Sequence, residues 1–469
     1  MKTIRYITLF ILSIAWFVGA GQKTMTLQEC REMSLRKNEN LKIAGKQLEK
    51  AEIQKAVART YRLPSFSATG MGIYQNKDFE MELILPTQKP NLLTGKLEPN
   101  LLIDPSTGYP VVGQDGNPVF NMYAWLPLNV SLSGAYVAGI AMEQPIYTGG
   151  KISAGNKMAD IGIEMAGENL ALQQMNTLEE ADKTYWTYIA VLEKVKLARQ
   201  AVTMLDEIVR KARNAHEVGL ANRNDLLKAQ VEYNSARLNL QKALNGLELS
   251  RMDLCRVTGL PFDTGITALD TIIMVETFTD KFRDNEQVEQ RPEYRLMQKN
   301  ISLQEQNIRL AKADFLPVAG IQAGYNHIGG IEFSGTDFSN TSLNVLASVK
   351  IPLFHWGEGM KKINAAKIDK EISLLEMGKN QQLLQLEMEQ AWLNLQLAVE
   401  RIRMNENALG QAEENLRVSR DNYELGMETV IGYLMAQTQW QQARSELIDS
   451  KTDFKIKETA WLKVTGRLK

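Results

Sequence analysis

The sequence repeats itself after 207 residues, and this internal repeat limits the possible fold more than any other feature. The clearest match is Val257-Thr258-Gly259, which returns as Val464-Thr465-Gly466. A chain of 469 residues that carries one unit twice is expected to form two similar halves rather than unrelated domains. We therefore predict two internal repeats, 21–259 and 291–469, joined by a linker over 260–290.

Apolar residues recur every seven positions within each repeat, which is typical of left-handed coiled-coil packing. No proline occurs in 146–260 or in 353–469, so both stretches are free to form long helices. We predict a long helix and a shorter antiparallel one in each repeat, over 151–216 with 223–257 and over 358–423 with 430–465. One apolar series and its counterpart 207 residues later are Ala181, Tyr188, Val195, Val202 and Val209, and Met388, Leu395, Ile402, Leu409 and Leu416.

Segments that alternate apolar with small or polar residues lie upstream of both long helices. They predict two strand pairs, 66–75 with 130–143 and 318–327 with 342–353. One apolar face and one polar face suit a β-barrel with lipid outside and water inside, although strands of a soluble sandwich alternate in the same way. Four strands are too few to close a barrel, so several chains would have to share one. The predicted fold class is mainly α with β: long coiled-coil-like helices and a barrel shared between chains.

A shorter helix is expected at the start of each repeat, over 26–61 and 292–314, because each segment ends at a Leu-Pro pair that disfavours helix. Thr26 and Glu29 have the spacing of a capping box, which marks the start of the first helix. The first repeat then carries 46 more residues than the second before its long helix. These extra residues coincide with a proline-rich stretch over 76–128, which predicts a long surface loop.

The first twenty residues have the pattern of a signal peptide. Lys2 and Arg5 precede an apolar run over 7–18, and Gly19-Ala20 supplies small residues before a cleavage site. The alternative is a single membrane anchor, for which the apolar run is short. We predict that 1–20 is a signal peptide and that the protein is exported.

Composition and residue placement argue against several classes of function. Lys and Arg number 54 and Asp and Glu 55, so the chain lacks the basic excess of a nucleic-acid-binding protein. The three histidines, His216, His327 and His355, are scattered and have no nucleophile or carboxylate at a motif spacing, so we expect neither an enzyme nor a metal or cofactor site. Cys30 and Cys255 are predicted to pack as small apolar residues, and the sequence leaves open whether they form a disulfide.

These features together resemble the TolC-like family of outer-membrane efflux proteins, over essentially the whole chain after the signal peptide. No single motif decides the resemblance, but their order, spacing and duplication support it. The matching stretches are Thr26-Leu27-Gln28-Glu29, Gln144-Pro145-Ile146-Tyr147, Val218-Gly219-Leu220, Cys255-Arg256-Val257-Thr258-Gly259-Leu260-Pro261 and Ala313-Asp314-Phe315-Leu316-Pro317.

The resemblance implies a homotrimer in which three chains build a barrel of twelve strands in the lipid of the outer membrane. Twelve long helices would continue the barrel as a tunnel through the periplasm. The shorter helices would stack end to end, 26–61 with 430–465 and 292–314 with 223–257. Such a duct would work with a periplasmic adaptor and an inner-membrane transporter, which supplies the energy, so the duct needs no cofactor or catalytic residue.

Gly219 and Gly426 stand between each long helix and its return, where a left-handed residue is needed. Asn222 and Thr429, three residues later, can cap the returning helices. In the family these turns form the far tip of the tunnel. Exposed apolar residues at such a tip suit docking of the adaptor. The expected docking residues are Val218, Gly219, Leu220, Leu425, Gly426 and Met427.

Three residues near the turns are expected to form a gate. The resemblance places Asp225 and Tyr423 at positions where polar links hold the tunnel closed, and a hydroxyl donating to a carboxylate would make a suitable latch. Asp225 could instead cap its helix through its spacing from Asn222. The basic gate residue of the family is replaced by Glu428, and its acidic constriction by Gly432 and Met435, so the gate is expected to use other contacts.

Alternatives to small-molecule efflux remain at this stage. A channel for peptide or protein export in a type I secretion system would have the same outer component. An exported trimeric coiled-coil fibre or adhesin would explain the heptads and the signal peptide, but not the duplicated strand pairs. The sequence does not identify the cargo.

Overall fold

The computed structural model describes residues 23–77, 79–86, 88–121, 123–132, 134–219, 221–270, 287–333 and 335–468. The predicted signal peptide and the middle of the predicted linker lie outside the described residues. The chain divides into two compact units. The helical unit takes in 1–56, 156–308 and 364–469, and the sheet unit takes in 57–155 and 309–363.

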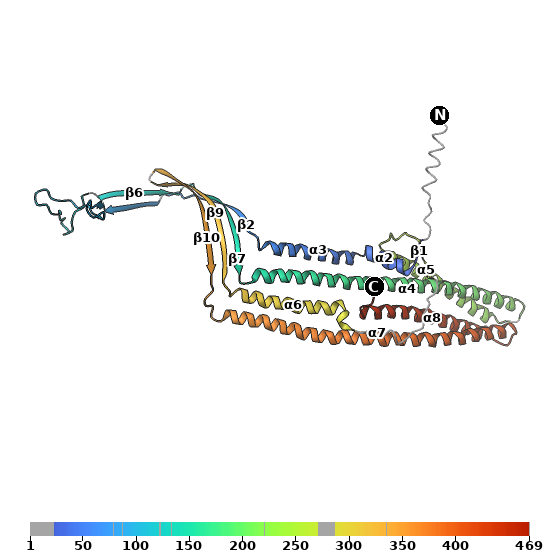
Figure 1. Cartoon of the computed structure of the whole chain (residues 1–469). Coiled ribbons are helices and arrows are strands. Elements are labelled where there is room, and N and C mark those ends of the chain that lie inside the picture. The colour runs from blue at the N-terminus through green and yellow to red at the C-terminus, as the bar shows by residue number, and fades with distance from the viewer. Residues whose placement is uncertain are drawn as a thin grey trace, which may run out of the picture. The chain divides into compact units, whose positions relative to one another are not determined.

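Helices dominate the first unit and repeat as predicted (Figure 1). The long helices α4 and α7 have 67 residues each, or about 100 Å at 1.5 Å per residue. None of the described helices has the length and hydropathy of a membrane-spanning segment. The helices are α2 (Leu27–Lys37), α3 (Glu39–Thr60), α4 (Lys151–Glu217), α5 (Arg223–Thr258), α6 (Pro292–Ala313), α7 (Glu358–Glu424) and α8 (Val430–Val464).

The segment predicted as one helix over 26–61 forms two. The predicted capping box is present, because the Thr26 hydroxyl accepts from the Glu29 amide and the Glu29 carboxylate accepts from the Thr26 amide. Asn38 then leaves the helical conformation, with ψ of 126°, and ends α2. Its side-chain oxygen accepts a hydrogen bond from the Leu41 amide at 3.2 Å, so the same residue starts α3. The prediction of an unbroken helix was wrong because it did not allow for asparagine as a cap.

Four long strands form the core of the sheet unit, and all their pairings are antiparallel. The order is β2 (Ser65–Ile73), β7 (Ala135–Thr148), β9 (Val318–Phe333) and β10 (Thr336–Lys350). Figure 1 shows β7, β9 and β10 side by side. The two predicted strand pairs are therefore confirmed, and β7 and β9 join them. In the described part of the chain, β2 and β10 each pair along one edge only.

The stretch predicted as a long loop over 76–128 contains further strands. Strand β3 (Phe79–Pro86) pairs with β6 (Tyr123–Ser131), and β4 (Gln88–Pro90) pairs with β5 (Leu97–Pro99). The β3–β6 pair contacts the end of β9 through Val130 and Ser131. The loop prediction was wrong because the prolines were taken as breakers. Here Pro86, Pro90 and Pro99 end strands, and Pro127 lies in the part of β6 that pairs with β3 alone, where a missing N–H is tolerated.

The register separates the four-stranded sheet into an apolar and a polar face. One row across all four strands consists of Phe66, Met142, Ala323 and Val345. The next row, on the opposite face, consists of Ser67, Ala141, Gly324 and Asn344. Phe66 and Val345 are exposed within the chain. The sheet therefore presents a broad apolar surface to its surroundings, as the alternation predicted.

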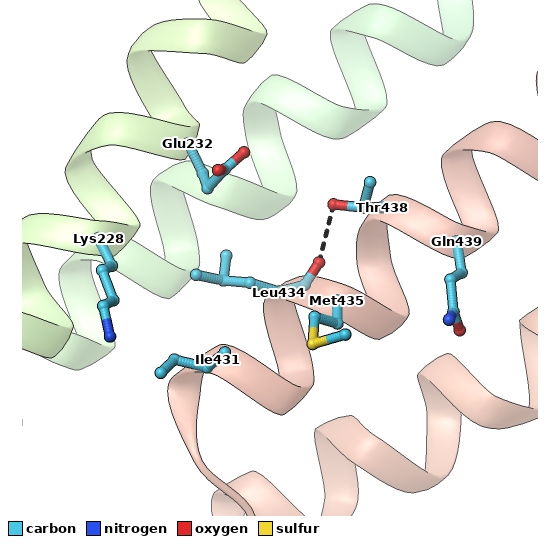
Figure 2. Close-up of a pocket in the computed structure, with 7 residues that line it drawn as sticks. All are labelled: Lys228, Glu232, Ile431, Leu434, Met435, Thr438 and Gln439. Carbon is cyan, nitrogen blue, oxygen red and sulfur yellow. Dashed lines mark hydrogen bonds between the residues drawn. The ribbon is translucent and has the colours of Figure 1, made fainter.

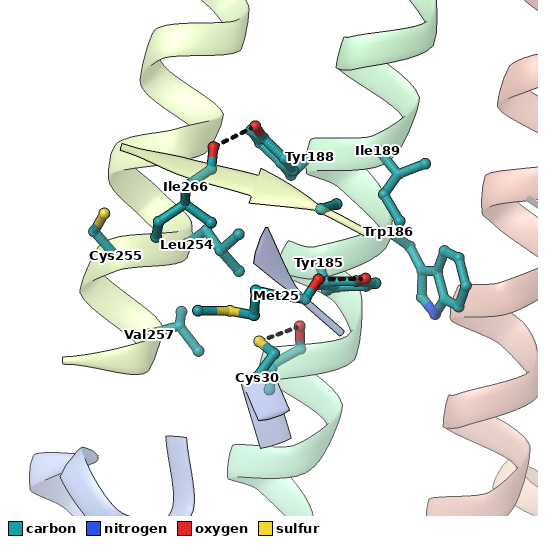
Figure 3. Close-up of a cluster of buried hydrophobic side chains, with 12 residues drawn as sticks. Met25, Cys30, Tyr185, Trp186, Tyr188, Ile189, Leu254, Cys255, Val257 and Ile266 are labelled. Carbon is teal, nitrogen blue, oxygen red and sulfur yellow. Dashed lines mark hydrogen bonds between the residues drawn. The ribbon is translucent and has the colours of Figure 1, made fainter. Parts of the chain in front are cut away.

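The core of the helical unit lies in three clusters along its helices. In the first (Figure 3), Met25 and Cys30 pack against Leu254 and Val257 at the end of α5. The short strand β1 (Lys23–Met25) runs parallel to β8 (Ile266–Ala268), which holds the chain after α5 beside the chain before α2.

The second cluster holds the start of α6 and the end of α8 together in the same way, within the second repeat. Val288, just before α6, packs with Phe454, Trp461 and Val464 of α8. The returning helix of each repeat thus meets the first helix of its own repeat. The implied stacking of 26–61 with 430–465 and of 292–314 with 223–257 is corrected, because β1–β8 pairing ties α5 to α2.

Candidate functional site at the helix turns

Two tight turns connect the long helices to their returning helices. Gly219 and Gly426 have φ of +79° and +73°, as predicted for left-handed residues. Their amides donate to the carbonyls of His216 and Tyr423. A Cβ at either glycine would meet nothing within 4 Å, so the backbone conformation alone favours glycine.

Each turn is followed by a capped helix. The Asn222 side chain accepts from the Asn224 amide at 3.2 Å, and the Thr429 hydroxyl accepts from the Gly432 amide at 3.1 Å. Both predicted caps are therefore present. Asp225 lies in the first turn of α5, where a negative charge is favoured near the helix N-terminus. Asn222 bonds the amide of Asn224, so its cap does not depend on the spacing to Asp225.

The apolar residues at the turns are exposed. Val218, Leu425 and Met427 are 70%, 71% and 69% exposed, and Leu220 lies outside the described residues. Exposure of three neighbouring apolar side chains on two turns is costly in water unless another molecule covers them. The described part of the expected docking surface is therefore available to a partner.

A cavity of about 710 Å³ lies between the two turns. The predicted gate residues Asp225, Tyr423 and Glu428 all line it. Among the described residues, however, the Asp225 carboxylate and the Tyr423 hydroxyl make no hydrogen bond with each other. Burial, followed by the charge of Asp225, raises the pKa of Tyr423. The structure brings the predicted gate residues together without forming the predicted bond within one chain.

Contacts around this cavity include two that the sequence did not indicate. The Tyr423 ring stacks on Tyr433 with centroids 5.5 Å apart and planes 29° apart. Lys211 Nζ lies 2.6 Å from Glu424 Oε1 and joins α4 to α7. The ion pair was missed because Lys211 and Glu424 lie in different repeats, and no spacing within one helix relates them.

The Glu428 side chain lies next to Gly432. A Cβ at Gly432 would meet the Glu428 carboxylate, which could move aside because it is the end of a flexible side chain. An acidic side chain thus lies at the start of α8, at a position where the family resemblance placed a constriction.

A second pocket, of about 320 Å³, lies between α5 and α8 (Figure 2). Met435, the other residue at the constriction position, lines it and is exposed. Ile431 and Leu434 provide further apolar walls, and Lys228 and Glu232 stand on the α5 side. At the two positions of the expected constriction, Met435 therefore carries an apolar side chain and Gly432 carries none.

Two of the histidines hydrogen-bond to neighbouring groups, and both cysteines are buried. His327 bonds the hydroxyls of Tyr136 and Thr341, and His216 bonds the carbonyl of Ala221. Within the described ranges, no group of three metal-binding side chains comes together. Cys30 and Cys255 are both buried in the first cluster as free thiols, so the structure shows no disulfide between them. Burial raises the pKa of the Cys30 thiol to about 12.

Known proteins with similar sequences are outer-membrane efflux components. The chain is 20% identical to the outer membrane efflux protein BepC of Brucella suis over 331 residues, 70% of this chain and 72% of that protein. It is 20% identical to the probable efflux pump outer membrane protein TtgC of Pseudomonas putida over 299 residues, 62% of this chain. It spans about three fifths, 61%, of that second relative's length.

Solved structures share the fold. The outer membrane protein VceC of Vibrio cholerae is 15% identical, with a TM-score of 0.67 over 94% of this chain and 96% of that one. The MtrE outer membrane channel of Neisseria gonorrhoeae is 16% identical, with a TM-score of 0.68 over 94% of this chain and 89% of that one.

Two repeats of strands and a helical hairpin, with paired glycine turns, define a TolC-like protein. More particularly, the family model of outer membrane efflux proteins matches residues 31–260 and 285–467, so the chain belongs to that family. It is accordingly a transport component of the outer membrane and not an enzyme. The predicted family, class and location are confirmed.

Proposed function

We propose that this protein is the homotrimeric exit duct of a tripartite efflux system. Three chains would share a barrel of twelve strands in the outer membrane, and their long helices would form the tunnel below it. Among the described residues, β2 and β10 each have one edge without a partner, which supports this arrangement, because edge strands of a sheet with one apolar face need partners.

The main support for a shared assembly is a helix face that is buried on α4 in the first repeat and exposed on α7 in the second. Trp186 and Ala190 of α4 are 8% and 6% exposed. Their counterparts 207 residues later, Leu393 and Leu397 of α7, are 61% and 58% exposed. Because the sequence repeats, its packing is expected to repeat as well. The exposed face of α7 should therefore pack against a helix that the single chain does not supply.

The first repeat indicates which helix that is. In the chain, α8 covers α4: Lys455 Nζ lies 5.7 Å from the centre of the Trp186 ring, and Lys194 pairs with Asp449. The repeat counterpart of α8 is α5, which exposes Leu227 and Leu249. We infer that α5 of a neighbouring copy covers α7.

Disulfide crosslinking tests the assembly. Leu249 follows Glu248, the counterpart of Lys455, so Leu249→Cys with Leu393→Cys should give disulfide-linked trimers in outer-membrane fractions. The matched control, Leu227→Cys with Leu393→Cys, moves one thiol by about 33 Å along α5 and should not crosslink. A soluble monomer, or equal crosslinking in both variants, would contradict the proposal.

The partners follow from the same proposal. An adaptor would dock on Val218, Leu425 and Met427 and on the neighbouring turn residues, and an inner-membrane transporter would supply the energy. The gate would lie at the cavity lined by Asp225 and Tyr423. Relatives named as efflux pump proteins support efflux over peptide secretion. A fibre is disfavoured, because both long helices turn back as hairpins.

A further inference from the structure

Three hydrogen-bonded side chains, His327, Thr341 and Tyr136, form a cluster on the sheet. The register pairs His327 of β9 with Thr341 of β10, and Tyr136 of β7 lies in the next row. His327 Nδ1 lies 2.8 Å from Thr341 Oγ1, and His327 Nε2 lies 3.3 Å from the Tyr136 hydroxyl. Tyr136 is 44% exposed and Thr341 is also exposed, so a molecule outside the chain can reach the cluster.

The cluster lies on the apolar face of the sheet, because side chains an even number of residues apart on a strand share a face. His327 follows Ala323 by four residues, and Thr341 precedes Val345 by four. Ala323 and Val345 belong to the apolar row described above. Within the described strands, the rows of this face from Val349 to His327 contain no charged side chain other than His327 when it is protonated. The cluster is therefore a polar site on a surface that is otherwise suited to lipid.

The cluster also lies at one end of the apolar band. Eight residues separate Val349 from Thr341 and Ala319 from His327, which corresponds to about 27 Å along a strand. At a strand tilt of about 40° this distance spans about 21 Å of membrane, close to the height of about 25 Å of a lipid-facing apolar band. Val349 and Ala319 lie at the strand ends next to α7 and α6. In the proposed barrel, the cluster therefore lies at the opposite edge, among the headgroups of the outer leaflet.

The cluster always has a hydrogen-bond donor that its own contacts do not use. Tyr136 and Thr341 each supply one O–H, and His327 supplies one N–H when it is neutral and two when it is charged. The two contacts of the cluster use two of these hydrogens, so one remains in the neutral state and two in the charged state. The remaining hydrogen belongs to a hydroxyl in both states, because a hydroxyl that accepts from the ring keeps its own O–H. Among the described residues, no other group accepts from these hydroxyls.

We propose that this cluster binds the phosphate group of a lipid in the outer leaflet. The Tyr136 and Thr341 hydroxyls donate to the phosphate, and His327 is a positioning residue that holds both hydroxyls. The inference rests on the proposed function, since the shared barrel places this face in lipid. Hydrocarbon cannot accept a hydrogen bond, so an unpaired hydroxyl there is costly. A phosphate oxygen satisfies the hydroxyl, and its charge makes the hydrogen bond stronger than one to a neutral acceptor.

Native mass spectrometry of the purified full-length protein in detergent tests the site. The probes are phosphatidic acid and diacylglycerol with the same acyl chains, which differ only in the phosphate. Wild-type protein should bind phosphatidic acid about five- to tenfold more tightly than diacylglycerol. Tyr136→Phe with Thr341→Val removes both hydroxyls at nearly constant side-chain volume and should reduce this preference to about twofold or less. His327→Leu leaves the hydroxyls without the ring that positions them and should lower the preference at least about twofold.

The matched control is Tyr325→Phe, which removes a hydroxyl from the same face one row closer to the helices and should bind both lipids like wild type. Equal loss in this control, or wild-type preference in the double variant or in His327→Leu, would overturn the site. Displacement of the lipid by millimolar inorganic phosphate would indicate a site for the free anion and overturn the assignment to lipid.

These outcomes also separate the site from the proposed function. Wild-type trimers that bind the two lipids equally would overturn the phosphate site and leave the proposed duct intact. Wild-type protein that forms no trimers would overturn the proposed function itself, and the site with it.

Discussion

Asp182 is the polar residue whose replacement should most damage the helical unit. It lies on α4 and is buried, and it joins three helices. Its carboxylate accepts from Arg31 Nε at 2.7 Å and from Arg31 Nη2 at 2.6 Å, and it accepts from the Thr459 hydroxyl at 2.7 Å. The hydrogen bond from Arg31 to this carboxylate raises the pKa of Arg31.

The expected losses follow from these contacts. Asp182→Ala removes all three hydrogen bonds and leaves Arg31 unpaired in a partly buried position, which should cost about 3–5 kcal/mol of unfolding free energy. Asp182→Asn keeps an acceptor for Thr459 but loses the charge, so we expect about 1.5–3 kcal/mol. Adding Arg31→Met to Asp182→Ala removes the unpaired charge and should recover about 2 kcal/mol.

Urea unfolding of the detergent-solubilised protein, followed by tryptophan fluorescence, measures these losses, because Trp461 and Trp186 lie in the neighbouring clusters. Lys194→Ala, in an exposed pair, serves as the control and should cost less than about 1 kcal/mol. A loss below 1 kcal/mol for Asp182→Ala, or a coupling between Arg31 and Asp182 below about 0.5 kcal/mol, would refute the reasoning.

Three further predictions concern the turns. Gly219→Ala or Gly426→Ala should each cost about 1–2 kcal/mol, since alanine must adopt a positive φ; a midpoint of urea unfolding equal to wild type would contradict this. Leu425→Ser should weaken site-specific crosslinking to the adaptor while trimers persist, and unchanged crosslinking would remove it from the docking surface. Asp225→Ala with Tyr423→Phe should raise the open fraction in bilayers if the two bond across chains; conductance like wild type would exclude them from the gate.

The repeat and the glycines made the helical part predictable from the sequence. A heptad pattern depends on side chains three and four residues apart, so local spacing is enough to predict α4, α5, α7 and α8. The left-handed residues were also predictable, for a reason that is equally local. Only glycine adopts positive φ without steric cost, and Gly219 and Gly426 recur at the same place in both repeats.

Other parts depend on contacts between distant segments. The β3–β6 pair forms inside a proline-rich stretch because each strand finds its partner about 45 residues away. The stacking of α5 on α2 depends on β1–β8 pairing, between strands of three residues each. The Lys211–Glu424 contact spans 213 residues. No local pattern encodes these pairings, so only the folded chain shows them.

In the proposed trimer, the exposed face of α7 and the strand edges that have no partner in the described part of the chain have a genetic consequence. A variant that damages Leu393 or the edge of β10 would be excluded from assemblies, and a normal copy of the gene would then supply complete ducts, so the defect would be recessive.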